Sequence, residues 1–415
     1  MKSEKKKKII LAVLLGLAGI LIIAGVVVQL IIPVTYEIDS SLIAKNPDYN
    51  VFVEKRNGYT TLVKKDSAGN VLDDDFKVIG FTDMHLDLKK DKGNYTMEYL
   101  IRNIVNEKPD LVVFVGDNIT SGLNWRRVRQ LCRVMEDLGV YWDCVLGNHE
   151  GDNFWSVSRS RMIKVFSSYD HCLAESGKKH TADGEEVWGN GNHVINLANS
   201  NGVTRSLYFI DGGAYMSPED MIKYDAEFDD KDHNDYDYVK ESQIKWYSET
   251  VAAIDAAEGR KIKSVVFDHI ALPEYTIAYN ELTGESEPTM DIPAYNVKNA
   301  DGDCIIMGQR RETVCNSGHN SGFFDAILKA ASTDLFVCGH DHVNDFVLTY
   351  KGVWLSYNEP SGYSSYNMIT SQRSDTMITG YTRYTFKPDA SFILEQFHNC
   401  DLYPEAQADI AKLYQ

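Results

Sequence analysis

The sequence lacks several features that identify common protein classes. No pair among its 7 cysteines has zinc-finger spacing, and we find no internal repeat and no low-complexity tract apart from a lysine run near the start. These absences exclude a zinc-finger module, a repeat solenoid and a low-complexity chain. With 415 residues, 44% of them hydrophobic, and only 10 prolines, the chain is long enough for one large core or two domains.

Positive charge is outnumbered by negative charge beyond residue 8. Residues 2–8 hold five lysines and one glutamate, whereas the whole chain has a formal net charge of −18. An acidic body repels the phosphate backbone of a nucleic acid. We therefore expect no nucleic-acid partner.

Long apolar runs are also scarce, and only residues 9–32 form one. These 24 residues contain no charged side chain and a single polar amide, Gln29. As a helix they span ~36 Å, enough to cross a hydrocarbon layer of ~30 Å. A transporter or receptor embedded in the membrane would need more such segments. The preceding lysines favour a cytoplasmic tail at 1–8, a transmembrane signal-anchor at 9–32 and a body outside the cytoplasm.

The alternative for this run is a cleaved signal peptide. Such a peptide has an apolar region of ~7–15 residues followed by a cleavage site of small residues. The run here is longer, and it ends in Gln29-Leu30-Ile31-Ile32-Pro33 without an A-x-A pattern. These features favour an uncleaved anchor.

The cysteine count is odd, so at least one thiol is free unless a partner chain takes part. Outside the cytoplasm a disulfide is allowed. Cys304 and Cys315 lie 11 positions apart in a polar segment and form a candidate loop disulfide. For Cys132, Cys144 and Cys338, core packing is the simplest interpretation.

The body alternates between predicted strands and helices, which is typical of an α/β sheet with crossover helices. Leu111–Val115 is continuously apolar, as expected for a strand buried on both faces. Predicted strands are 77–81, 111–115, 141–146, 194–197, 206–210, 263–267, 335–338, 346–350, 353–357, 379–386 and 391–397. Predicted helices are 97–105, 124–138, 243–257, 323–331 and 404–413, and 273–318 is predicted to hold loops.

The predicted organisation after the anchor has three parts. Residues 33–75 form a tether and a hairpin, with turn signals at Asn57-Gly58 and Ala68-Gly69-Asn70 beside strand-like runs at Tyr59–Val63 and Val71. Residues 76–400 form one domain, because the polar blocks described next are spread across it. Residues 401–415 form a terminal helix.

Five polar blocks follow predicted strands or lie in connecting loops. In chain order they are Asp83-Met84-His85, Gly116-Asp117, Gly147-Asn148-His149-Glu150, His269 and Gly339-His340-Asp341-His342. Four of them lie at the carboxyl ends of strands, which converge on one edge of an α/β sheet. Together they supply the carboxylate, amide and imidazole ligands that two metal ions need. A two-metal site hydrolyses phosphate esters.

This series of blocks resembles the calcineurin-like metallophosphoesterase superfamily over residues 76–350. Three further segments resemble its single-domain, purple-acid-phosphatase-like members: His269–Tyr275, Gly318–Phe324 and Gly339–Phe346. True purple acid phosphatases use a metal-bound tyrosine in the place of His85, so no purple colour is expected. The resemblance implies a four-layer αββα sandwich of two mixed sheets flanked by helices.

The resemblance also implies a role for each site residue. The first metal site would consist of Asp83, His85, Asp117 and His342, and the second of Asp117, Asn148, His269 and His340. Asp117 would bridge two divalent or trivalent ions of Fe, Mn or Zn. A hydroxide bridging the metals would attack phosphorus in line, without a covalent enzyme intermediate. His149 would protonate the leaving oxygen or hold a phosphate oxygen, oriented by Glu150 or another carboxylate.

The expected protein is thus a membrane-anchored ectoenzyme that hydrolyses phosphate mono- or diesters of small-molecule or peptide substrates. One alternative is the same scaffold acting on phosphoproteins or lipid pyrophosphates. Another is a non-catalytic, metal-binding surface protein.

The remaining candidates have simpler interpretations. Gly191-Asn192-His193 copies the letters of a ligand block but leads into a strand and lacks the following carboxylate. Arg310 and Arg311 could clamp a phosphate, although solvent exposure is the commoner state for paired loop arginines. Segments 212–240 and 273–318 are expected to shape the substrate cleft. Ordinary surface or core roles are expected for His171, His180, His193, His233, His319 and His398. For His319, contact with substrate is the alternative, because it opens a predicted helix within a segment that resembles the family.

Overall fold

The computed structural model describes residues 2–31, 48–87, 90–120, 124–152, 156–226, 235–284, 297–298, 304–368 and 377–414. Among these, the strands form two mixed sheets. The larger sheet has the order β1 (Asn50–Arg56), β2 (Tyr59–Lys65), β6 (His193–Asn199), β7 (Gly202–Phe209), β8 (Lys263–Phe267), β11 (Thr333–Cys338), β13 (Val353–Tyr357), β12 (Val347–Tyr350), β10 (Cys304–Met307) and β9 (Val297–Lys298). The smaller has the order β15 (Phe392–His398), β14 (Gly380–Phe386), β3 (Phe76–Phe81), β4 (Leu111–Val115) and β5 (Trp142–Val145).

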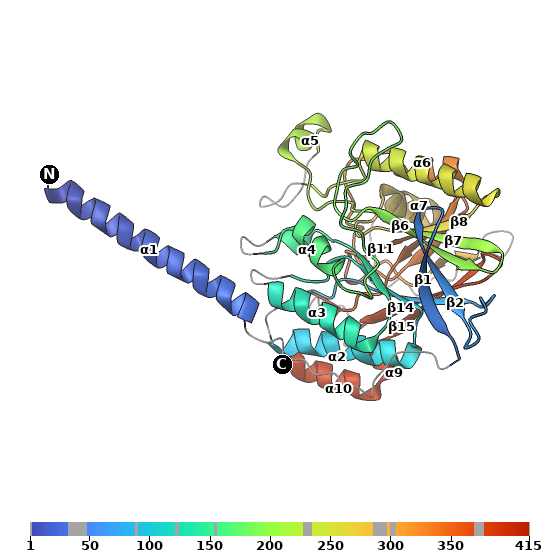
Figure 1. Cartoon of the computed structure of the whole chain (residues 1–415), viewed down its shortest axis with the longest axis horizontal. Helices are drawn as coiled ribbons and strands as arrows, with labels where there is room; N and C mark the ends of the chain where they lie inside the picture. Colours follow the sequence, from blue (N-terminus) through green and yellow to red (C-terminus); the bar gives the residue numbers. More distant parts are fainter. Residues whose placement is uncertain are drawn as a thin grey trace.

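Helices cover the outer faces of both sheets (Figure 1). The smaller sheet packs against α2 (Lys90–Glu107), α3 (Trp125–Leu138) and α4 (Arg159–Phe166), and the larger against α6 (Glu241–Glu258), α7 (Pro273–Thr283) and α8 (Phe323–Ala330). Shorter described helices are α5 (Pro218–Lys223), α9 (Asn399–Leu402), α10 (Pro404–Leu413) and a 3-10 turn at His149–Gly151. The predicted four-layer αββα sandwich is therefore confirmed.

The alternation of side chains along β4 shows how the layers are held together. Val113 packs between the two sheets, whereas Phe114 packs against the helices of the outer layer. In the larger sheet, Phe267 of β8 likewise faces the inter-sheet core and Val266 faces the helices. Because both faces of these strands are covered, all of their residues can be apolar.

The predicted hairpin is present at Asn57-Gly58, where β1 and β2 pair antiparallel. Both turn residues have positive φ, 51° and 85°, as a two-residue hairpin turn requires. Strand β2 also pairs in parallel with β6, so the hairpin forms one edge of the larger sheet.

The N-terminal helix α1 (Lys2–Ile31) projects away from the sheets (Figure 1). Of the helices within the described residues, it alone, over Glu4–Gly25, is long and apolar enough to cross a membrane. Its large apolar side chains are exposed, among them Leu15 and Leu21. Some signal sequences are also long and apolar enough to cross a membrane, and the helix is consistent with a single-pass anchor.

Two sequence-based expectations are wrong. Residues 273–318 were predicted to hold loops, but α7 begins at Pro273, because proline is well suited to the first turn of a helix. The candidate disulfide with Cys304 is not formed, since Cys315 is a free thiol. The predicted core positions of Cys132, Cys144 and Cys338 are confirmed, as all three are buried.

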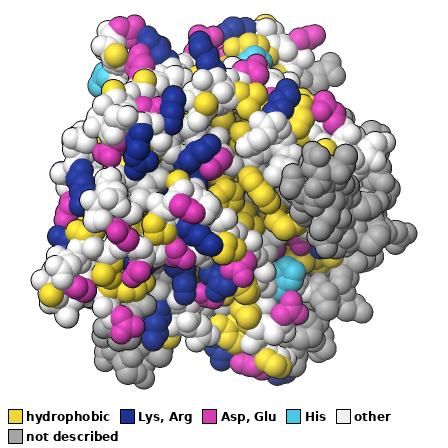
Figure 2. All heavy atoms as spheres, turned by 90° about the vertical axis from the view of Figure 1, so that its right-hand side faces the viewer, with side chains coloured by type: hydrophobic (Ala, Val, Ile, Leu, Met, Phe, Trp, Pro, Cys, Tyr) yellow, Lys and Arg dark blue, Asp and Glu magenta, His cyan; other side chains and the backbone are white. Residues whose placement is uncertain are grey.

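Charges are interspersed on the face shown in Figure 2, where lysines and arginines lie among acidic side chains. On this face the acidic side chains are not gathered into one region.

Candidate metal centre

The five polar blocks converge because each follows a strand end. Strands β3, β4 and β5 are parallel neighbours in the smaller sheet, and β8 and β11 are parallel neighbours in the larger one. Backbone hydrogen bonds join the loops: His85 N donates to Asp117 O at 2.9 Å, and Gly339 N donates to His269 O at 3.0 Å. The carboxyl ends of both sheets thus deliver their polar side chains to one place.

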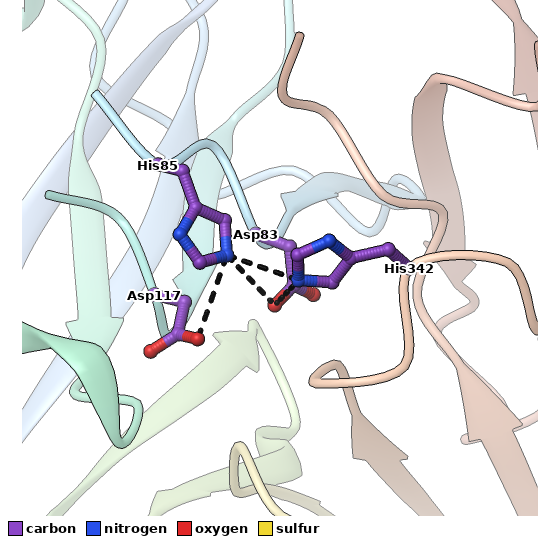
Figure 3. Close-up of side chains that lie close together, drawn as sticks. All are labelled: Asp83, His85, Asp117 and His342. Carbon is purple, nitrogen blue, oxygen red and sulfur yellow. Dashed lines mark hydrogen bonds and ion pairs between the residues drawn. The ribbon is translucent and has the colours of Figure 1, made fainter. Parts of the chain in front are cut away.

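One group of side chains consists of Asp83, His85, Asp117 and His342 (Figure 3). His85 Nε2 lies 3.6 Å from Asp117 Oδ2 and 3.0 Å from His342 Nε2. His342 Nε2 lies 3.4 Å from Asp83 Oδ1. All four residues are buried. Burial and the adjacent His342 lower the pKa of His85 to about 3, which leaves a neutral ring able to act as a ligand.

A second group shares Asp117 and adds His269 and His340. His269 Nε2 lies 3.3 Å from Asp117 Oδ2. Asn148 is fully buried, and its amide nitrogen donates to Tyr215 Oη at 3.1 Å. Because the nitrogen of the amide faces Tyr215, its oxygen Oδ1 is the atom that can accept or bind an ion. Because Asp117 belongs to both groups, its carboxylate lies between two candidate ion positions.

Several buried atoms of these residues have no hydrogen-bond partner among the residues that the structure describes. They are Asp83 Oδ1, Asp117 Oδ2, Asn148 Oδ1, His269 Nε2 and both ring nitrogens of His340. A buried polar group without a partner costs about 1–3 kcal/mol. Lone pairs on oxygen and imidazole nitrogen suit Fe, Mn or Zn. The residues present therefore fit two cations, and these groups indicate a dinuclear site.

In several of these side chains, the polar atom that faces away from the cluster is held by a backbone group. His269 Nδ1 contacts Val115 O at 2.8 Å, and His342 Nδ1 contacts Tyr366 O at 3.0 Å. Since Nδ1–H donates to a carbonyl, the lone pair of Nε2 must point inward in both rings. Asp83 Oδ2 accepts from His340 N at 2.9 Å, which directs Oδ1 to the cluster.

The backbone carries strain at the same positions. Asp83, His85, Asp117 and His340 have φ of 52°, 43°, 48° and 80°, in the left-handed region that such residues rarely adopt. A Cβ on Gly116 would lie 2.3 Å from the His269 ring, so only glycine allows this approach. Strain of this kind clusters at functional sites.

His149 lies at the exposed side of the cluster. Its side chain is 39% exposed, and its Nε2 lies 4.0 Å from Asp117 Oδ2. Its Nδ1 forms a short contact with Asp152 Oδ2. Burial opposes the charged ring, but Asp152 and Asp117 outweigh it and raise the pKa of His149 to about 9.

Glu150 does not contact the ring that it was expected to orient. It is fully buried and accepts hydrogen bonds from the backbone N–H groups of Asn118 at 2.6 Å and Gly147 at 2.7 Å. Glu150 therefore shapes the two ligand loops, and Asp152 is the carboxylate beside His149. The sequence placed both acids near His149 but did not indicate which one turns toward it.

The other candidates lie in ordinary contacts. His193 is buried and pairs with Asp143 at 2.8 Å, and His171 pairs with Glu136 at 2.8 Å. His319 stacks on Tyr224 with 3.6 Å between ring centroids. His233 lies outside the described residues.

The expectation of solvent-exposed arginines was wrong. Arg310 is buried, and its Nη1 donates to Asn280 Oδ1 at 3.0 Å. Arg311 Nη1 lies 2.8 Å from Asp345 Oδ1. Both guanidinium groups are therefore committed to protein partners.

Two tyrosines that pack on histidines of the cluster were not predicted from the sequence. The ring of Tyr236 meets His340 edge-on with 4.4 Å between centroids, and Tyr366 stacks on His342 at 4.2 Å. The abundance of tyrosine in 212–240 was a partial signal for Tyr236, whereas nothing in the sequence singled out Tyr366.

Comparisons with known proteins agree with this geometry. The family model for the calcineurin-like phosphoesterase matches residues 76–344. The protein named probable inactive purple acid phosphatase 14, from Arabidopsis thaliana, is 27% identical over 331 residues, covering 71% of this chain and 72% of that protein. Phosphatase DCR2 of Saccharomyces cerevisiae is 26% identical and covers 68% of this chain and 47% of that protein.

A solved structure of similar fold is a dimetal phosphatase from Danio rerio. It is 13% identical, covers 78% of this chain and 100% of that chain, and has a TM-score of 0.45. The family match spans more than half of the sequence and contains every polar block described above. This chain belongs to the calcineurin-like phosphoesterase family.

Proposed function

We propose that the protein is a membrane-anchored phosphoesterase that hydrolyses phosphate mono- or diesters at a dinuclear metal centre outside the cytoplasm. The observation that carries the proposal is the set of unpartnered, buried atoms that surround the shared carboxylate of Asp117. In this proposal Asp83, His85 and His342 would hold one ion, Asn148, His269 and His340 would hold the other, and Asp117 would serve both.

When bound, two such cations polarise phosphoryl oxygens and lower the pKa of water toward neutrality. The chain's own contribution is orientation and proton transfer. The buried ligands, fixed from behind by backbone groups, hold their donor atoms in place before substrate arrives. His149, partly exposed and paired with Asp152, holds a proton that it can give to the leaving oxygen.

The names of the relatives bear on whether the site is catalytic, since one is called a phosphatase and another probably inactive. In this chain every proposed ligand is present and His149 lies beside them. A non-catalytic metal-binding protein would not need a partly exposed histidine paired with an acid at the edge of the cluster. These residues favour catalysis over binding alone.

The proposal predicts that purified full-length protein, in detergent and with Mn²⁺, Zn²⁺ or Fe²⁺, hydrolyses an aryl phosphate or its diester. The same preparation stripped with a chelator should lose the activity and regain it when the ion is returned. Phosphopeptide and lipid-pyrophosphate arms of the assay would identify the substrate class. Metal binding without hydrolysis in any arm would instead establish the non-catalytic alternative.

The proposed orientation has its own test. Five lysines precede the apolar segment and favour a cytoplasmic N-terminus. A protease added to the outside of intact cells should therefore digest the phosphoesterase domain and spare a tag at the N-terminus. Protection of the domain with digestion of the tag would reverse the proposed orientation, and release of the domain into the medium would indicate cleavage of the segment.

A further inference from the structure

A second group of potential ligands lies apart from the dinuclear centre. It consists of Asp345, Glu359 and His398. Asp345 precedes β12 and Glu359 follows β13 in the larger sheet, whereas His398 ends β15 in the smaller one. His398 Nε2 lies 3.4 Å from Glu359 Oε1 and 4.0 Å from Asp345 Oδ2. One side chain from each of three distant segments therefore points to a common position between the two sheets.

Glu359 is the observation that points to a ligand. The residue is 0% exposed, and within the described part of the chain neither of its carboxylate oxygens accepts a hydrogen bond. A charge-assisted hydrogen bond from an imidazole would measure about 2.7–2.9 Å, shorter than the 3.4 Å to His398. A buried carboxylate left in this state is costly. Its neighbours, Asp345 and His398, are also potential metal ligands.

The spacing of the group matches that of the dinuclear centre. There, nitrogen and oxygen atoms of different ligands lie 3.3 Å apart for His269 and Asp117 and 3.9 Å apart for His85 and Asp83. Two ligands bound tetrahedrally to one ion at about 2.1 Å lie about 3.4 Å from each other. The separations of 3.4 and 4.0 Å around His398 therefore leave room for an ion between the atoms.

The carboxylate oxygen of Asp345 that faces away from the group is held by protein donors, as is common for metal ligands. Asp345 Oδ1 accepts from Gln309 N at 2.6 Å and pairs with Arg311 Nη1 at 2.8 Å, so Oδ2 is the oxygen directed to the group. His398 turns Nε2 toward Glu359 and Asp345, while its Nδ1 lies on the outer side, 3.4 Å from the exposed carboxylate of Asp401.

We propose that Asp345, Glu359 and His398 bind a third divalent cation, of the Zn²⁺ or Mn²⁺ class, that braces the loops of the dinuclear centre. Two carboxylates and one imidazole suit these ions. Asp345 lies three residues after His342 on the same loop. Glu359 leads into Ser361, whose N–H donates to Thr82 O at 2.8 Å, next to Asp83. The ion would thus tie two ligand loops to the end of β15.

The test is the number of ions per chain. Full-length protein is equilibrated with Zn²⁺, or separately with Mn²⁺, freed of unbound ion by desalting, and analysed by mass spectrometry of the metal. Wild type should hold three ions, Glu359→Gln two, and Asp117→Asn about one. An ion count for Glu359→Gln equal to that of wild type would overturn the proposal. An Asp117→Asn protein that keeps all its ions would instead count against the dinuclear centre, so the two failures are distinguishable.

A matched control uses a histidine and carboxylate pair that already forms a hydrogen bond. Glu136→Gln alters the pair of His171 and Glu136, 2.8 Å apart, and should leave the ion count unchanged. Should Glu359→Gln fold poorly, His398→Gln removes a ligand whose side chain is already 29% exposed. Added Zn²⁺ should raise the melting temperature of Asp117→Asn but not of the double variant Asp117→Asn/His398→Gln. An equal rise in both variants, or no rise in either, would show that no ion binds through His398 and would overturn the proposal.

Discussion

Replacing Asp117 by Asn is expected to lower phosphoesterase activity by about 10³-fold or more. Its carboxylate is fully buried and belongs to both ligand groups, with Oδ2 3.3 Å from His269 and 3.6 Å from His85. An amide is nearly isosteric but carries no charge, so it cannot offset two adjacent cations. Both ion positions should weaken together, since they share this one side chain. The measurement is kcat/KM on an aryl phosphate, with the ion count determined on the same sample.

A second buried aspartate supplies the control. Asp143 is also fully buried and faces a histidine, His193, at 2.8 Å, but it lies outside the ligand groups. Asp143→Asn removes the same charge and should leave the ion count unchanged. The proposed role of Asp117 is wrong if Asp117→Asn keeps wild-type activity and both ions, or if Asp143→Asn loses ions to the same degree.

The pattern of apolar strand segments in the sequence predicted most of the fold. The apolar run at 111–115 predicted a strand buried on both faces, and the structure places its alternate residues against the other sheet and against the helices. The rule that strand ends converge predicted that distant blocks would meet, and all five blocks, not four, follow a strand. Local periodicity sufficed here because parallel strands impose a common direction on their loops.

The order of strands and the finer contacts could not be predicted in the same way. Sequence gives no indication that β2 pairs with β6 across more than a hundred residues, because such pairing depends on the packing of the whole sheet. Glu150 and Asp152 are both near His149 in sequence, and only the 3-10 turn at His149–Gly151 decides which carboxylate reaches its ring. Prolines at 218 and 273 begin helices, a role that composition alone does not distinguish from loop breaking.

The role of His149 leads to a second large effect that depends on the substrate. His149→Ala should lower kcat/KM by about 10²–10³-fold for an alkyl phosphate, because the poor leaving oxygen needs a proton as its bond to phosphorus breaks. For an aryl phosphate with an acidic phenol the loss should be about 10-fold or less, since that oxygen leaves without a proton. The ion count should stay unchanged, because His149 belongs to neither ligand group.

A series of aryl and alkyl phosphates measures this dependence as the slope of log kcat/KM against leaving-group pKa. The slope should steepen in His149→Ala and, to a smaller extent, in Asp152→Asn, whose carboxylate contacts Nδ1 and acts only through the ring. His171→Ala, a half-buried histidine paired with Glu136, serves as the control and should leave the slope as in wild type. An equal loss for every leaving group would assign His149 to holding a phosphate oxygen instead of protonating the leaving group. Unchanged hydrolysis would remove it from the reaction and direct the search for the acid to other groups at the mouth of the centre, such as Tyr236 beside His340.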